Sequence, residues 1–93
     1  MTHQAFLDEP PQSTLLTSYD RAHMKLYMRL LDAETDAADW REAVALLFGI
    51  DAGREPERAY RVHRSHLARA RWMREYGYRQ LAREACYRDV MLS

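Results

Sequence analysis

The apolar residues of this chain repeat at the three- and four-residue spacing of an α-helix in successive segments, and no strand is needed to account for the rest. Over residues 17–34 the following fall on one helical arc: Tyr19, His23, Leu26, Tyr27, Leu30 and Leu31. Arg21, Lys25 and Arg29 fall on the opposite arc. Because an apolar stripe of this kind has to be buried against another element, the pattern predicts a small all-α domain of about four helices.

Capping residues set the predicted ends of the first two helices. Thr17 or Ser18 can cap the first helix, and Asp20 lies three residues after Thr17, close to a capping-box pattern. In the segment TDAADWREAVALLFG, residue 35 or 36 can cap a second helix, and Gly49 is a natural stop. The large apolar residues of this second helix recur at helical spacing and are predicted to be core: Trp40, Val44 and Leu47.

A third helix is predicted from Pro56, which suits a first helical turn, to about Tyr76, with Gly77 ending it. The segment YRQLAREAC then predicts a short fourth helix. Residues 1–16 contain a Pro-Pro pair and little periodicity, which predicts an irregular lead-in. The expected organisation is therefore this lead-in, one domain over residues 17–85, and a C-terminal tail over 86–93.

Ninety-three residues suffice for one domain with a modest core. No apolar run approaches the length that spans a bilayer, and the N-terminus lacks the basic start and apolar run of a signal peptide. Cys86 is the sole cysteine and cannot form an internal disulfide. These features predict a cytoplasmic protein that does not contact a membrane.

The formal net charge is zero, which argues against a simple polybasic binder of nucleic acid. The charge is uneven, however, because residues 1–53 hold nine acids against four bases, whereas residues 54–93 hold ten arginines against five acids. The arginine-rich segment is therefore the place to look for a functional surface.

Little in the sequence indicates a catalytic or metal-binding site. The chain has no Gly-rich phosphate loop and no nucleophile elbow, so we expect neither an enzyme, a small-molecule substrate nor a cofactor. His63 and His66 form an HxxH pair, for which Cys86 could be imagined as a third metal ligand. Both histidines lie on the apolar arc, so packed core histidines and no metal are expected.

Two helices joined by a glycine-containing connection and supported by a first helix suggest a helix-turn-helix core, although the connection from Gly49 to about Glu55 is longer than usual. The segments LLDAE, ADWRE and SHLARARWM resemble a helix-turn-helix family with an extended turn, carried on proteobacterial integrative and conjugative elements. The resemblance covers roughly residues 19–83. It implies that the long connection is part of the fold.

The resemblance also implies two possible roles. In one, the domain is the DNA-binding C-terminal half of a transcriptional activator. In the other, it stands alone as an antiactivator, which binds the N-terminal domain of a cognate activator and blocks excision and conjugative transfer of the element. Since about sixteen residues precede the first helix, the stand-alone role is expected, with the activator as partner and no direct DNA binding.

Two alternative surfaces follow from these roles. The predicted docking face for the activator is Arg69, Trp72, Tyr76, Tyr78 and Leu81, with Trp72 placed by helical spacing on the mostly polar arc. A DNA-binding regulator would instead use Arg54, Arg58, Arg61 and Arg64, although acids surround the end of the helix that would enter a groove. A dimerising structural module is a third, weaker alternative.

Overall fold

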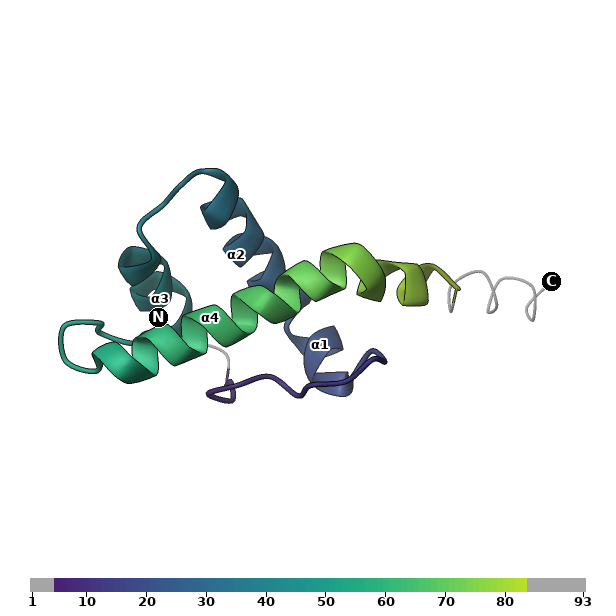
Figure 1. Cartoon of the computed structure of the whole chain (residues 1–93), viewed down its shortest axis with the longest axis horizontal. Helices are drawn as coiled ribbons and strands as arrows, with labels where there is room; N and C mark the ends of the chain where they lie inside the picture. The colour runs from purple at the N-terminus through teal and green to yellow at the C-terminus, as the bar shows by residue number, and fades with distance from the viewer. Residues whose placement is uncertain (1–4, 84–93) are drawn as a thin grey trace.

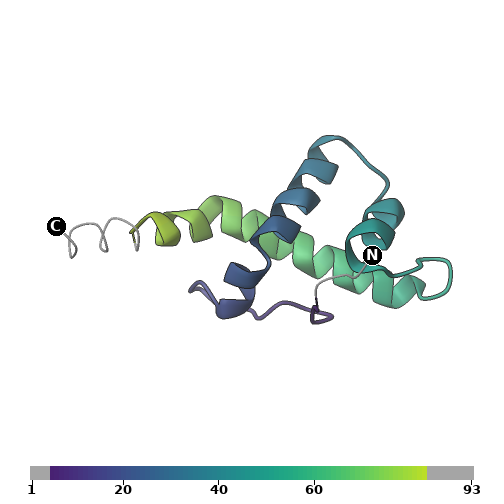
Figure 2. The ribbon, with the colours of Figure 1, turned by 180° about the vertical axis from the view of Figure 1, so that it is seen from behind.

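The computed structural model describes residues 5–83, which form an all-α fold with no strand among them, as predicted. The helices are α1 (Ser18–Ala22), α2 (Met24–Thr35), α3 (Trp40–Phe48) and α4 (Pro56–Trp72), and α4 continues through the π-helical turn η1 (Met73–Gly77). Helix α4 runs along the long axis, with α2 and α3 on one side and α1 with the N-terminal segment on the other (Figures 1 and 2). No helix in the described range is long and apolar enough to cross a membrane.

The first predicted helix is divided in two at His23. Its predicted start is confirmed, because Thr17 and Asp20 form a capping box at the beginning of α1. The prediction that one helix runs unbroken to about residue 34 is wrong. The His23 ring bonds the carbonyl of Tyr19 through Nδ1 and that of Ala5 through Nε2, each at 2.8 Å, and its backbone leaves helical geometry. The break therefore coincides with the attachment of the N-terminal segment.

Helix α3 begins later than predicted. Asp39 accepts the backbone N–H of Arg41 at 2.9 Å and is the N-cap of a helix that starts at Trp40, so the predicted cap at residue 35 or 36 is wrong. The predicted stop at Gly49 is confirmed, since this residue has the left-handed conformation with φ 71°. A glycine adopts that conformation without the steric cost of a Cβ atom.

Gly77 does not end a helix, contrary to prediction. The chain passes through η1 and remains helical over residues 78–83, so the predicted separate fourth helix is a continuation of α4. The glycine serves a different need. A Cβ atom at this buried position would lie 2.4 Å from Sδ and 3.1 Å from Cε of Met73, a side chain that is itself fully buried. The close approach of the π-helical turn to Met73 therefore requires a residue without a side chain.

We expect Gly77→Ala to lower the free energy of unfolding by about 1–3 kcal/mol, because overpacking a filled core costs energy of this order. Gly53→Ala is a suitable control, since a Cβ atom there would meet only the exposed Asp51 carboxylate at 3.1 Å. Urea denaturation followed by circular dichroism compares the two variants. Equal effects would show that Met73 can move aside.

The core has two parts. The larger lies between α2, α3 and α4 and is formed by Leu30, Val44, Phe48, Ile50, Ala59 and Val62. The smaller surrounds Tyr27, Ala70 and Met73 near the end of α4. The N-terminal segment has no helix or strand from residue 5 to 17, as predicted, but it packs against the domain. Phe6 lies edge-on to Phe48, with 5.0 Å between ring centroids, so this segment contributes to the larger core.

Candidate protein-docking surface

Arg69 lies inside the domain and is not part of an exposed docking face, contrary to prediction. Only 4% of the residue is exposed. Its guanidinium donates to both carboxylate oxygens of Asp20, at 2.9 and 2.6 Å. It also donates to the carbonyls of Ser13 at 2.7 Å and Leu15 at 3.1 Å. Arg69 therefore joins α4 to α1 and to the N-terminal segment.

The other residues of the predicted face divide between core and surface. The Trp72 ring stacks on the Arg69 guanidinium, with Cζ 3.8 Å from the ring centroid, and packs beside the smaller core. Tyr78 and Leu81 pack against the same core and are partly buried. Tyr76 is 57% exposed. The structure thus leaves Tyr76 exposed and Trp72 partly exposed, where it lines a surface cleft of about 550 Å³ beside residues 12–14.

Two of the four arginines of the alternative DNA face pair with the chain's own acids. Asp8 of the N-terminal segment accepts from Nε of Arg58 at 3.2 Å and from Nη2 of Arg61 at 3.1 Å. Arg58 also lies 3.6 Å from the Glu55 carboxylate. The guanidinium of Arg64 instead lies over the Tyr60 ring, 5.9 Å from its centroid. Arg54 is exposed in the connection before α4, where neighbouring acids are exposed with it.

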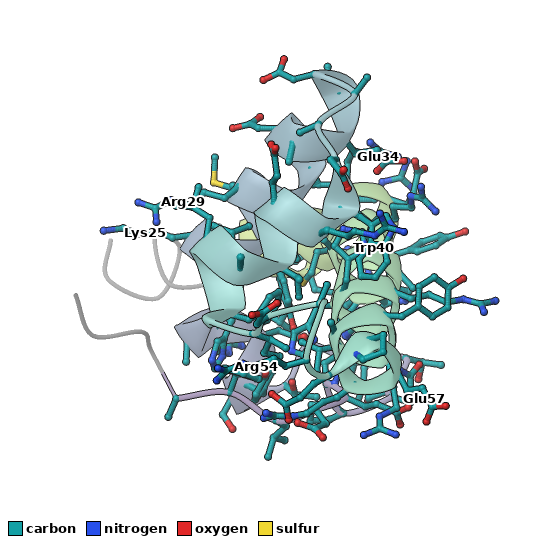
Figure 3. The ribbon with its side chains drawn as sticks, turned by 90° about the vertical axis from the view of Figure 1, so that its left-hand side faces the viewer. Lys25, Arg29, Glu34, Trp40, Arg54 and Glu57 are labelled. Carbon is teal, nitrogen blue, oxygen red and sulfur yellow. The ribbon has the colours of Figure 1, made fainter. Side chains whose placement is uncertain are left out.

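A second surface, which the sequence did not reveal, lies where the start of α3 meets the outer side of α4. It is a shallow cleft of about 540 Å³, and we call it the aromatic–arginine cleft; its lining residues are Trp40, Tyr60, His63, Arg64, Leu67, Ala68 and Arg71. Figure 3 shows Trp40 beside α4, whereas Lys25 and Arg29 project from the opposite side of the molecule. The cleft therefore combines aromatic rings with guanidinium groups on one face.

Ring contacts hold the aromatic part of the cleft in place. The Trp40 ring is edge-on to Tyr60, with 5.6 Å between centroids and an angle of 77°, and it lies 5.8 Å from the His63 ring. Trp40 also touches the larger core, as predicted for a core residue, but it remains partly exposed. Helical spacing alone cannot show whether Trp40 packs in the core or lines a surface cleft. A residue at the edge of an apolar stripe can do both.

The charges around the cleft are mixed, with two arginines in its lining and Glu34 paired with one of them. Arg71 donates to the Glu34 carboxylate through Nε and Nη2, and this hydrogen bond holds the pKa of Glu34 below its usual value. Burial lowers the pKa of His63, so its imidazole is neutral at pH 7. Arg64 adds a second guanidinium on the same side of α4, and Arg41 lies over the Trp40 ring at 5.7 Å.

The two HxxH histidines, both predicted to be packed core residues, are buried to different extents. His66 is fully buried, whereas His63 is half-buried in the wall of the cleft. Among residues 5–83 no cluster of three histidine, cysteine or acidic side chains is placed to hold a metal ion. The imagined third ligand, Cys86, lies outside the described residues.

The described residues therefore offer a cleft that combines aromatic rings with two arginines, and a second arginine-rich surface on which Asp8 pairs with Arg58 and Arg61. In comparisons with known proteins, no family model matches this chain, and no curated protein sequence matches it either.

Proposed function

We propose that this protein is an antiactivator, which binds the N-terminal domain of a cognate transcriptional activator and so blocks excision and conjugative transfer of a mobile element. The proposal takes α3 and α4, with the long connection between them, as a helix-turn-helix unit of the family that the sequence resembles. The observation that carries it is the contrast between two faces of α4. On one face Asp8 pairs with Arg58 and Arg61, and the other presents aromatic rings together with Arg64 and with Arg71, which pairs with Glu34.

The ion pairs of Asp8 with Arg58 and Arg61 favour a role that does not require DNA. Lys and Arg side chains supply most non-specific DNA affinity by neutralising phosphates and releasing counterions. Here Asp8 pairs with Arg58 and Arg61, two of the four arginines that a DNA-binding regulator would need, and so offsets part of their positive charge. Exposed Glu55 precedes the first turn of α4 and exposed Glu57 lies in it, at the end of the helix that enters the major groove in such regulators.

The aromatic and arginine side chains of the aromatic–arginine cleft favour a protein partner. Aromatic residues and arginine are the side chains that most often dominate the energy of protein interfaces. In this proposal the chain acts by occupancy: it imitates the activator's own helix-turn-helix domain and covers the surface that this domain would contact. Activation then fails because the activator's two domains cannot engage each other. Such a mechanism needs no catalytic group and no cofactor.

We expect the protein to capture the activator encoded on the same element, and to capture that activator's isolated N-terminal domain equally well. The isolated C-terminal domain of the activator should not be captured, and it is the matched control. Purified proteins and analytical ultracentrifugation measure the complex and also report self-association. Micromolar or tighter binding of the protein to promoter DNA, with a steep dependence on salt, would contradict the proposal and favour the DNA-binding alternative.

A further inference from the structure

The aromatic–arginine cleft has a geometry that restricts what can occupy it. Along α4, Tyr60, Arg64, Leu67 and Arg71 recur at three- and four-residue intervals, so they form one line on its surface. Arg64 and Arg71 are two helical turns apart, or about 10 Å at the rise of an α-helix. Leu67 lies between them, and Trp40 forms the facing wall from α3. The cleft is thus an apolar centre between two guanidinium groups.

We propose that this cleft binds an acidic segment of the partner protein, in which an apolar side chain lies between two carboxylates. This inference rests on the proposed function, because it assigns the segment to the activator's N-terminal domain. The apolar side chain packs against Leu67 and the rings of Trp40 and Tyr60. The two carboxylates pair with Arg64 and Arg71, whose planar guanidinium groups can each bind a carboxylate through two hydrogen bonds.

The charges of the cleft favour an acidic protein segment over nucleic acid. A nucleic-acid strand places a phosphate at every nucleotide and needs a continuous basic track. Here Glu34 lies beside Arg71, and Asp39 and Glu42 are exposed at the start of α3. Positive charge is therefore confined to a few guanidinium groups. A peptide can match those isolated points with isolated acids and fill the apolar centre between them.

Glu34 forms an ion pair with Arg71, so its carboxylate competes with the proposed partner for the Arg71 guanidinium. Both side chains are substantially exposed, at 37% and 50%. An exposed pair of this kind contributes little to stability, so a partner carboxylate can replace Glu34 at small cost. This gives the proposal a test in which one substitution should strengthen binding, a result that damage to the fold cannot imitate.

We expect Glu34→Gln to tighten binding of the activator's N-terminal domain about two- to fivefold, because it frees Arg71. Arg64→Glu should weaken binding by about tenfold or more, since it places a like charge against the partner. Arg54→Glu makes the same charge change at an exposed position that does not line the cleft, and it should leave affinity unchanged. Isothermal titration calorimetry measures all four proteins. Equal affinities for Arg64→Glu and Arg54→Glu would overturn the cleft assignment but leave the antiactivator function intact.

A second measurement does not need the activator. We expect a synthetic peptide with one leucine between two aspartates, spaced to match the arginines, to shift the indole N–H signal of Trp40 in nuclear magnetic resonance spectra. The Trp72 indole should not respond, and a peptide with asparagines in place of the aspartates should bind more weakly. Peptide binding without activator binding would refute the proposed function and keep the acidic preference of the cleft. Stronger shifts with single-stranded DNA, or none with the peptide, would overturn the inference.

Discussion

Replacing Arg69 by methionine should lower the free energy of unfolding by about 3–5 kcal/mol, because it leaves a buried charge without its partner. Asp20 has no exposed side-chain surface, and its carboxylate would remain in the core without its counter-charge. The remaining hydrogen bonds, from the Tyr27 hydroxyl at 2.8 Å and the Thr17 N–H at 3.0 Å, cannot supply a positive charge. Domains of this size are stable by about 5–15 kcal/mol, so the variant should be marginally folded.

Urea denaturation followed by far-ultraviolet circular dichroism measures this loss. Arg79→Met is the matched control, because Arg79 is exposed, and it should change stability by less than about 0.5 kcal/mol. The double variant Asp20→Asn with Arg69→Met should recover part of the lost stability, since it removes the buried charge. If Arg69→Met were as stable as Arg79→Met, the buried ion pair would not hold α1 and the N-terminal segment to α4.

The same contacts explain why Arg69 is a poor probe of partner binding. Its guanidinium holds the carbonyls of Ser13 and Leu15 as well as Asp20, so its loss should release the N-terminal segment. A binding defect in an Arg69 variant would therefore report unfolding. Arg64 and Glu34 avoid this difficulty, because both lie at the surface.

Local chemistry explains which parts of the fold the sequence could predict. The capping box at Thr17 and the left-handed stop at Gly49 depend on neighbouring residues alone, and both are present. The role of Gly77 depends on the depth of Met73 in the core, which no local pattern encodes. A glycine after a long amphipathic stretch looks the same whether it ends a helix or permits a close contact.

Long-range contacts explain the errors in the predicted docking face. The predicted face includes Arg69, but its buried partner Asp20 is 49 residues away in sequence, so no local pattern reveals the pair. Trp72 is partly buried, and its ring stacks on that guanidinium. The aromatic–arginine cleft was missed because its facing wall, Trp40, comes from another helix. Buried ion pairs and inter-helix clefts both require the tertiary fold before they can be recognised.

Acidification should destabilise the protein well above the range in which carboxylates titrate. His66 is fully buried, and burial lowers its pKa from 6.5 to about 4. Its Nδ1 donates to the Val62 carbonyl at 2.8 Å, so Nε2 is the acceptor for the Tyr19 hydroxyl at 2.6 Å. Protonation of Nε2 would remove that acceptor and place a charge in the core. The folded state therefore holds the imidazole neutral.

The free energy of unfolding changes with pH because the folded and unfolded chains bind protons differently at His66. Between pH 6.5 and about 4 the unfolded chain binds a proton at this histidine and the folded chain does not. The free energy of unfolding is therefore highest above pH 6.5 and falls as the pH is lowered, by about 2 kcal/mol between pH 7 and pH 4.5. Burial lowers the pKa of His63 too, so that residue acts in the same direction. Asp20, whose pKa lies below 3.8, adds its own loss only at lower pH.

Urea denaturation at several pH values from 7 to 4.5 measures this dependence. His66→Gln keeps a neutral hydrogen-bonding side chain at every pH in the range, so it should be less stable at pH 7 but show a much flatter pH profile. Since His63 and Glu34 remain in that variant, its residual profile reports what these groups contribute together. An unchanged profile would mean that His66 titrates alike in both states, which requires water to reach its ring in the folded protein.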